Sequence, residues 1–576
     1  MAAADNEPAE IPMVNVQIDG EWIQVPKGTR MIEACKIAGK EIPHYCYHPK
    51  LTSPGNCRMC LVEMGMPPRP RPGEEPKRDA DGFQPIGWMP RPAIACANTV
   101  ADNMGIRTDS ELTRTCREGV MELLLINHPL DCPICDQAGE CTLQEFSVEH
   151  GKGESRFREE KVHKPKNVDI GPRIRLDDER CVMCSRCIRF TDEIADDPVL
   201  GFTDRGSHTV LAVAPGRELA NNYSLNTVDI CPVGALTSND FRFQMRVWFL
   251  KETKSIDVNC GTGCNILIHS REDTVHRITP RENNDVNSAW MPDSHRLNFH
   301  YIDSPDRLTE PLVREGDVHR MAEWPEALER VRTEIGEFEA SEIAVIASGR
   351  MTNEELFMAK RLANALGVEN GHLDIVPRIG EDDGYLISAD RNPNTNGAKV
   401  ILGMNEPGSN LDKIKNGVGS GRIRVLFVLG EDLTENGLFE KADLEKPELL
   451  VCTHITANET ADAAAIVLPA AAWAEKRGSM INVTGRIQRL NQAVERPGKA
   501  RDDWEILRDL TMAVGGSNGI HLIEEVFKAM ATDIEVFAGL TLTKIGDQGR
   551  QLLDTGVKIP LLEREAERKA SGMIVG

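Results

Sequence analysis

Cysteine spacing constrains this chain more than any other feature. Sixteen cysteines occur in 576 residues, and eleven of them fall into three groups. The groups comprise Cys46, Cys57, Cys60 and Cys96; His128, Cys132, Cys135 and Cys141; and Cys181, Cys184, Cys187 and Cys231. Because no secretion signal is visible, the thiols should be reduced, and their clustering indicates metal sites rather than disulfides.

The first group has the spacing C-x10-C-x2-C with a distant fourth cysteine, Cys96. Four thiolates can hold a [2Fe–2S] cluster. Four thiolates that include a C-x2-C pair also suit zinc, so both metals remain open from spacing alone. Gly55 should allow the sharp backbone turn that directs several donors to one point.

The central group has the spacing H-x3-C-x2-C-x5-C and begins at His128. A lone histidine is more often structural, but at this spacing we expect His128 to be a metal ligand. A neutral imidazole in place of a thiolate makes a cluster less negative and should raise its reduction potential. Its second nitrogen can also form a hydrogen bond.

The third group, C-x2-C-x2-C followed by Cys231-Pro232, is similar to the opening of the bacterial ferredoxin pattern. It contains no second triplet, so one [4Fe–4S] cluster is the simplest expectation. Arg186 and Arg189 flank the triplet. They either offset the negative charge of a cluster or are surface residues.

Length and charge limit the function further. A chain of 576 residues should form three or more domains, and its net charge of −23 argues against nucleic-acid binding. The first twelve residues lack the apolar core of a signal peptide. The longest nearly apolar run, residues 463–474, is shorter than the roughly 18 residues of a membrane span, so the chain itself should not cross a bilayer.

Local patterns predict several elements. Alternation around Asp19-Gly20 predicts a β-hairpin, and apolar spacing predicts helices over 31–38 and 110–127. The proline-rich residues 64–92 should be a surface insertion. Beyond residue 312, apolar runs at 341–347, 424–429 and 448–452 predict buried parallel strands, and Thr352-x-x-Glu355 predicts a helix start. Cys35, Cys116 and Cys452 are expected in the core.

Four stretches together resemble one known family. They are IPHYCYHPKLTSPGNCRMCLVEM, GVMELLLINHPLDCPICDQAGECTLQE, ERCVMCSRCIRFTDEI and DICPVGAL. They are similar to the large iron–sulfur subunit of NADH:quinone oxidoreductase (respiratory complex I), which is known as the G subunit in bacteria and the 75-kDa subunit in mitochondria.

This resemblance implies a multidomain α+β and α/β protein. It implies a β-grasp [2Fe–2S] ferredoxin-like domain at 1–100, a one-His/three-Cys [4Fe–4S] domain at 101–150 and a [4Fe–4S] ferredoxin-like domain at 151–250. A degenerate molybdopterin-type [4Fe–4S] domain at 251–312 and a molybdopterin-oxidoreductase-like α/β domain at 313–576 should follow.

The resemblance also implies three clusters and no catalytic site in this chain. The ligands would be Cys46, Cys57, Cys60 and Cys96 for [2Fe–2S], His128, Cys132, Cys135 and Cys141 for one [4Fe–4S], and Cys181, Cys184, Cys187 and Cys231 for the other. The clusters would relay electrons from a flavin- and NADH-binding subunit toward quinone. The other implied partners are a small [2Fe–2S] subunit, the quinone-site subunit and a ferredoxin-like subunit, on the cytoplasmic side of a bacterial inner membrane.

The chain departs from the family pattern in its second half. Some members carry a further [4Fe–4S] cluster, but here the first and last ligand positions read Asp257 and Pro292, which leaves Cys260 and Cys264. We expect that cluster to be absent and the two thiols to be remnants on a hairpin; a zinc or labile site that shares Asp257 is the alternative. A GxGxxG fingerprint is absent, and we expect no molybdenum cofactor and no flavin.

Two other functions remain open. The chain could serve a hydrogenase or an NAD-linked formate dehydrogenase, although only Cys452 follows residue 264, too few cysteines for a hydrogenase, and a formate dehydrogenase needs molybdenum. It could also be an interaction scaffold stabilised by zinc.

Overall fold

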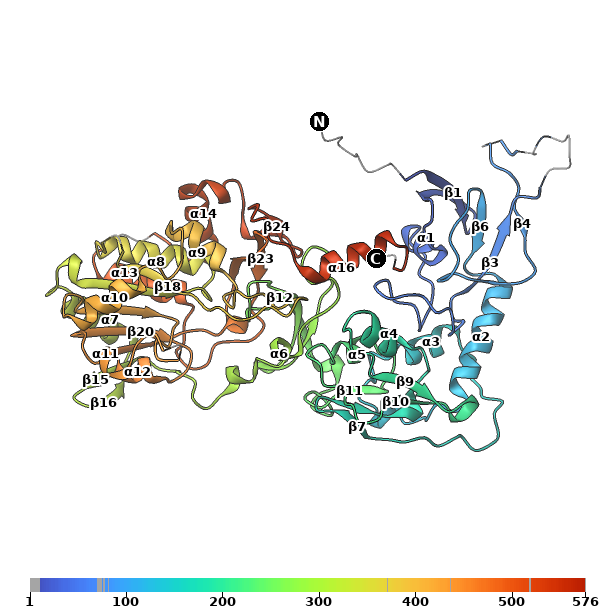
Figure 1. Ribbon diagram of the computed structural model, residues 1–576, viewed down its shortest axis with the longest axis horizontal. Coiled ribbons are helices and arrows are strands. Elements are labelled where there is room, and N and C mark those ends of the chain that lie inside the picture. Colours follow the sequence, from blue (N-terminus) through green and yellow to red (C-terminus); the bar gives the residue numbers. More distant parts are fainter. Residues whose placement is uncertain are drawn as a thin grey trace. The chain divides into compact units, whose positions relative to one another are not determined.

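The structure is a computed structural model that describes residues 11–69, 75, 78–80, 82–369, 371–435, 437–516 and 519–574. The first ten residues lie outside the described residues, and so do residues 70–74, 76–77 and 81 of the predicted insertion. The expectations for these residues stay predictions. The chain forms two compact units (Figure 1). Unit 1 comprises Met1–Trp248 and Glu565–Gly576, and unit 2 comprises Phe249–Arg564.

Unit 1 begins with a small mixed sheet and one helix. The strands are β1 (Met13–Ile18), β2 (Glu21–Pro26), β3 (Leu61–Met66), β4 (Gly87–Trp88), β5 (Ala93–Ile94) and β6 (Met104–Arg107), in the order β2-β1-β6-β3-β4 with β5 beside β3. The predicted hairpin is confirmed: Asp19 and Gly20 have φ of 50° and 95°, as its tight turn requires. The predicted helix is α1 (Met31–Ile37), which places Cys35 in the core.

Helix α2 (Glu111–Leu125) confirms the second predicted helix, and its N-cap Ser110 accepts a hydrogen bond from Thr113 N–H. The expectation that Cys116 lies in the core was wrong. The most buried side chains are Thr113, Arg117 and Met121, whereas Cys116 is only half-buried and Leu123 is 70% exposed. The helix instead turns Met121 into a cluster that contains cysteine-loop residues, so tertiary packing selects the face.

The rest of unit 1 is built from short elements. They are α3 (Thr142–His150), β7 (Val168–Gly171), β8 (Ile174–Leu176), α4 (Arg186–Glu193), β9 (Leu200–Thr203), β10 (Val210–Val213), α5 (Asn226–Asp229) and β11 (Leu236–Ser238). The sheets are β11-β8-β7 and β10-β9. The last helix, α16 (Pro560–Ala570), contributes its residues from Glu565 onward, where Glu565 pairs with Lys50 and Arg568 with Glu193.

Unit 2 contains a seven-stranded sheet. Its strands are β16 (Val318–Met321), β15 (Leu312–Glu315), β21 (Ile466–Pro469), β20 (Leu449–His454), β19 (Val425–Leu429), β17 (Ile343–Ser348) and β18 (Leu373–Val376), in this spatial order. The five strands from β21 to β18 are parallel, which confirms the predicted buried parallel strands. Between β17 and β19 the strand order reverses, and such a reversal opens a crevice at the carboxyl ends of the strands.

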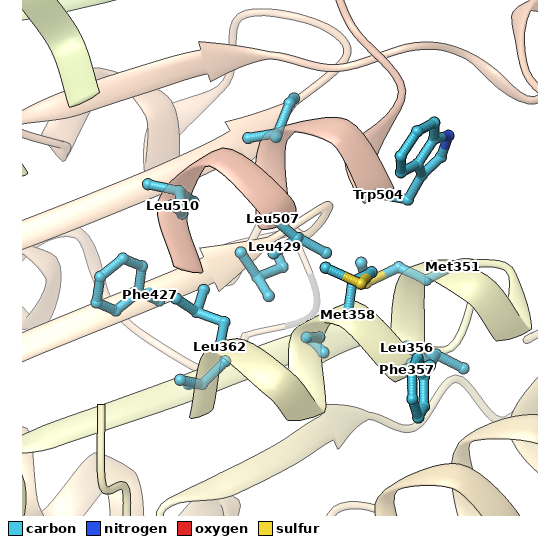
Figure 2. Packing of buried hydrophobic residues seen from close by; sticks show 14 of the residues in the cluster. Met351, Leu356, Phe357, Met358, Leu362, Phe427, Leu429, Trp504, Leu507 and Leu510 are labelled. Carbon is cyan, nitrogen blue, oxygen red and sulfur yellow. The ribbon is translucent and has the colours of Figure 1, made fainter. Parts of the chain in front are cut away.

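Both faces of this sheet are covered. Phe427 and Leu429 of β19 point to a core formed with α8 (Asn353–Ala365) and α13 (Asp503–Ala513), as Figure 2 shows. Leu426 and Val428 of the same strand belong to a second core. That core also holds buried residues of α10 (Leu411–Gly419), α11 (Lys441–Leu444) and α12 (Glu459–Ala463).

The remaining helices and strands of unit 2 precede, connect or follow the strands of this sheet along the chain. They are β12 (Lys251–Ile256), β13 (Asn265–Arg271), β14 (Thr274–Pro280), α6 (Asp293–Arg296), α7 (Trp324–Ile335), α9 (Thr395–Leu402), β22 (Gly478–Ile481), β23 (Arg486–Leu490), α14 (Ile523–Asp533), α15 (Leu542–Ile545) and β24 (Arg550–Gln551). The predicted capping box is present, since Thr352 and Glu355 exchange hydrogen bonds at the start of α8. Cys452 of β20 is buried in the second core, as expected. Among the described residues, no helix is both long and apolar enough to cross a bilayer.

A buried ion triad fixes α8 and α13 to the loop before β22. Lys476 Nζ lies 2.8 Å from Glu355 and 3.2 Å from Asp503, and its side chain is 8% exposed. Burial disfavours the ammonium charge, but the two carboxylates outweigh it and raise the pKa of Lys476 well above its ordinary value.

Replacing this lysine should strongly destabilise unit 2. Lys476→Met leaves Glu355 and Asp503 buried without a counter-charge, and we expect the free energy of unfolding to fall by about 3–5 kcal/mol. Urea unfolding followed by tryptophan fluorescence measures the change. The control Arg332→Met removes an exposed pair with Glu329 and should cost less than about 0.5 kcal/mol. A loss below about 1 kcal/mol for Lys476→Met would contradict this assignment.

Candidate metal centres

The first group of cysteines is gathered by loops around β3. Cys46 follows α1, Cys57 and Cys60 precede β3, and Cys96 follows β5. The thiols of Cys57 and Cys96 both contact that of Cys46, and the Cys60 thiol contacts that of Cys96. Gly55 has the left-handed φ of 61° that the sharp turn requires. These contacts connect the four thiols in a chain, and four thiolates are the ligand number of a [2Fe–2S] cluster.

The third group also converges. Cys181, Cys184, Cys187 and Cys231 all line one small cavity of about 20 Å³, whose other walls are mostly apolar. The left-handed residues Met183 (φ 52°) and Ser185 (φ 62°) let the chain turn the triplet toward this cavity before α4 begins. Four thiols around one apolar cavity fit a [4Fe–4S] cluster.

Backbone N–H groups are directed at these sulfur atoms. Met183 N–H donates to Cys181 Sγ at 3.4 Å. The backbone N–H groups of Val233, Ala235 and Leu236 act to lower the pKa of Cys231, and the thiol itself donates to Val233 O at 3.1 Å. Such donors stabilise a thiolate and influence the reduction potential of a bound cluster.

The third group is too buried for its thiols to ionise unaided. Burial raises the pKa of Cys231 to about 11 and that of Cys187 well above its ordinary value. Only a positive centre that takes the place of the protons can make these residues thiolates. A metal centre supplies that charge.

The central group lies between α2 and α3. His128 follows the end of α2, where Lys161 Nζ donates to the carbonyls of Leu125 and Ile126 at 2.8 Å. Cys132 opens a short 3₁₀ turn, and Cys141 is the N-cap residue of α3. Cys135 is buried and Cys132 is exposed.

The ion pair between Arg180 and Asp131, 2.6 Å long, influences both His128 and Cys135, so these two candidate ligands lie near the same charges. Burial lowers the pKa of His128 to about 4. The imidazole is therefore neutral at pH 7, the form that binds metal. Its ligation of a cluster stays a prediction.

A single apolar cluster includes members of all three groups. They are Cys46 and Cys57 of the first group, Cys141 of the second, and Cys181, Cys184 and Cys231 of the third. Tyr45, Met59 and Met121 are among the fully buried side chains that pack with them. The first and third groups therefore share one water-poor core, which the central group reaches through Cys141.

Two arginines tie the first and third groups together. Arg186 donates to the carbonyls of Tyr47 and Ile230, and Arg189 donates to those of Cys46 and Thr52. Both side chains are half-buried and lie within the electrostatic reach of several thiols. The two arginines therefore connect the two loops by hydrogen bonds. The alternative that they are surface residues, which the sequence left open, is wrong.

The second and third groups are also in contact. Thr142 N–H donates to Pro232 O at 3.1 Å. A Cβ added at Gly234 would lie only 2.4 Å from Cys135 Sγ, so glycine is required there. The segment after Cys231 therefore forms one wall of the central site.

The region after residue 250 brings together residues that the sequence did not single out. Cys260 and Cys264 are buried in the loop of the β12–β13 hairpin. Pro292 is the N-cap residue of α6, and His295 of that short helix reaches Asp257 at 2.7 Å. His295 stands three residues beyond the expected ligand position, and its spacing carried no signal of its own.

Unit 2 also contains a cavity of about 360 Å³ at the carboxyl ends of the parallel strands. Arg350, Arg378, Lys476 and Trp473 are among its lining residues. Arg378 pairs with buried Glu431, and Lys476 belongs to the ion triad, so much of this positive charge is neutralised. No cysteine is among the lining residues that the structure describes, so the lining offers no thiolate for molybdenum.

Family models match successive parts of the chain. A 2Fe–2S cluster-binding domain matches residues 12–111, the NADH-ubiquinone oxidoreductase-G iron–sulfur binding region matches 117–156, and the NADH-quinone oxidoreductase subunit 3 ferredoxin-like domain matches 171–237. An NDSU1/NuoG-like 4Fe–4S domain matches 250–300, and molybdopterin oxidoreductase matches 307–376 and 389–513. These matches show an iron–sulfur front half and a molybdopterin-oxidoreductase-like rear half.

Among solved structures, the chain is similar to one from an NAD+-reducing [NiFe]-hydrogenase in the H2-reduced state. The two are 27% identical, and the match covers 41% of this chain and 91% of that one with a TM-score of 0.33.

Curated relatives are similar over longer stretches. The G subunit of NADH-quinone oxidoreductase from Rickettsia felis is 42% identical over 62% of this chain and 50% of its own length, so the chain spans about half of that relative. The mitochondrial NADH-ubiquinone oxidoreductase 78 kDa subunit of Neurospora crassa is 32% identical over 89% of this chain and 82% of its own length. The chain therefore belongs to the family of the large iron–sulfur subunit of NADH:quinone oxidoreductase.

Proposed function

We propose that this chain is an electron-transfer subunit of a proton-pumping NADH:quinone oxidoreductase with three iron–sulfur clusters. The ligands are Cys46, Cys57, Cys60 and Cys96 for [2Fe–2S], His128, Cys132, Cys135 and Cys141 for one [4Fe–4S], and Cys181, Cys184, Cys187 and Cys231 for the other. When bound, such clusters supply one-electron oxidation and reduction. The observation that carries the proposal is the apolar cluster shared by all three cysteine groups.

The residues of this chain hold the sites and set their surroundings. The shared core excludes water, which lowers the local dielectric around the sulfur atoms. Backbone donors and the two arginines offset the negative charge of thiolate-bound centres. Binding, orientation and electrostatic tuning are therefore the work of unit 1, and no bond-forming step on a substrate is assigned to it.

The partners that we propose are those that the family resemblance implies. The electrons come from a flavin- and NADH-binding subunit and leave toward quinone through ferredoxin-like and quinone-site subunits, with a small [2Fe–2S] subunit nearby. The chain lies on the cytoplasmic side of a bacterial membrane as a peripheral subunit. Unit 2 is a scaffold without a molybdenum cofactor, a role that the thiol-free cavity lining supports.

Metal analysis of the anaerobically purified chain tests this function. We expect about ten irons with matching sulfide per chain, and no molybdenum. Zinc in place of iron at the three cysteine groups would favour the scaffold alternative. Stoichiometric molybdenum would instead favour a formate-dehydrogenase-type function.

Removing one ligand of the third group should remove one cluster. Cys231→Ala should lower the iron content by about four atoms per chain, because the site loses a thiolate and its N–H···S bonds. The control Cys452→Ala changes a buried cysteine outside the three groups and should leave the iron content unchanged. Equal iron in the two variants would refute the ligand set.

His128 offers a test on the reduction potential. His128→Cys should keep a cluster but lower its potential by on the order of 100 mV, because a charged thiolate replaces a neutral imidazole. Potentiometric titration followed by low-temperature electron paramagnetic resonance measures this shift. The control is His163→Ala, since the His163 side chain is largely exposed. If His128→Ala alters neither the iron content nor any potential, His128 is not a ligand.

A further inference from the structure

The residues between 250 and 300 do not fit the cluster that their family model names. That model describes a 4Fe–4S domain, and such a cluster takes four ligands, usually cysteines. Only two cysteines, Cys260 and Cys264, occur in this stretch of the sequence. The structure instead gathers a mixed set of donors at the loop of the β12–β13 hairpin.

Three buried side chains meet there. Asp257, Cys260 and His295 each offer one donor atom, and all three atoms lie within 4.8 Å of one another. Among the described residues, no other group of three or more His, Cys, Asp or Glu side chains brings its donor atoms this close together. The three residues are 2%, 0% and 7% exposed, respectively.

We propose that Asp257, Cys260 and His295 form a binding site for one divalent transition-metal ion, with zinc as the preferred ion. A carboxylate oxygen, a thiolate sulfur and an imidazole nitrogen are all zinc ligands. Calcium and magnesium prefer oxygen alone, so the donor set argues against them.

The dimensions suit one ion. Bonds of about 2.0–2.3 Å place the ligand atoms of a tetrahedral zinc site roughly 3.5 Å apart. His295 Nδ1 and Asp257 Oδ2 are 2.7 Å apart as hydrogen-bond partners. They need to separate by less than about 1 Å to bind one ion together. Cys264, the second buried thiol of the loop, is not a member of the group that meets within 4.8 Å.

The charges also balance. A carboxylate and a thiolate carry two negative charges, which a divalent ion neutralises in a site that water does not reach. Zinc binding releases the thiol proton of Cys260, because the ligand is the thiolate.

A second layer of hydrogen bonds orients the carboxylate. Asn259 donates to Asp257 Oδ1 from its side-chain Nδ2 at 2.6 Å and from its backbone N–H at 3.2 Å. Asn298 in turn donates to Asn259 Oδ1 at 2.5 Å. Asp257 Oδ2 is thereby left facing His295, as expected where outer hydrogen bonds fix a metal ligand. The backbone of Asp257 is held as well, by its N–H bond to Cys264 O at 2.8 Å.

The site can be tested on the full chain with Zn²⁺ as the probe. The anaerobically purified protein is incubated with Zn²⁺ and desalted, and zinc and iron are then counted by mass spectrometry. We expect about one zinc per chain with the iron content unchanged. X-ray absorption at the zinc K-edge should show one or two sulfur neighbours near 2.3 Å and nitrogen or oxygen neighbours near 2.0–2.1 Å. Iron clusters do not contribute at that edge, so this measurement is independent of the three proposed clusters.

Variants identify the ligands. Cys260→Ser and His295→Gln should each weaken zinc binding at least tenfold, while Cys452→Ser, which changes a buried cysteine elsewhere in unit 2, should bind zinc like the wild type. Thermal unfolding checks that each variant folds. If a variant does not fold, the X-ray absorption spectrum of the wild type decides whether sulfur binds the zinc. Retention of less than a tenth of a zinc by the wild type, a spectrum without sulfur, or a loss of four irons in Cys260→Ser would overturn the proposal.

Discussion

Burial of cysteine sulfur is the constraint on which unit 1 depends. Burial raises the pKa of Cys181 and Cys231, yet backbone N–H groups point at both sulfur atoms as if these were anions. The two features are compatible only when a cationic centre replaces the thiol protons. The elements around the sites are short, such as α5 with four residues and β5 with two. Bound metal would therefore add stability to that of the apolar core around β1, β3 and β6.

Unit 2 depends on a more ordinary principle. Successive residues of β19 alternate between two apolar cores, and helices cover both faces of the sheet. Several of its buried charges are paired, as in the Lys476 triad and the Arg378–Glu431 pair. Lys476 and Arg378 both line the cavity beside the strand ends. Two of the positive side chains that line this crevice are thus neutralised by internal ion pairs, which agrees with a scaffold descended from an enzyme domain.

The sequence predicted what depends on short-range spacing. The hairpin at Asp19-Gly20, the capping box at Thr352 and the parallel strands follow from patterns a few residues long, and the structure contains all of them. The structure also brings the cysteines of the first group into contact with one another, and it places those of the third group around one cavity. The buried face of α2 could not be predicted, because loops distant in the sequence decide it. His295 was missed for the same reason: thirty-eight residues separate it from Asp257, and only the fold makes them neighbours.

The arginines of α4 make the first and third cysteine groups interdependent. Arg186 and Arg189 belong to the helix that starts within the third cysteine group, but they donate to carbonyls of the loop that carries Cys46. A substitution that displaces this helix would therefore disturb the loop of the first group as well, although 139 positions of sequence separate Arg186 from Tyr47.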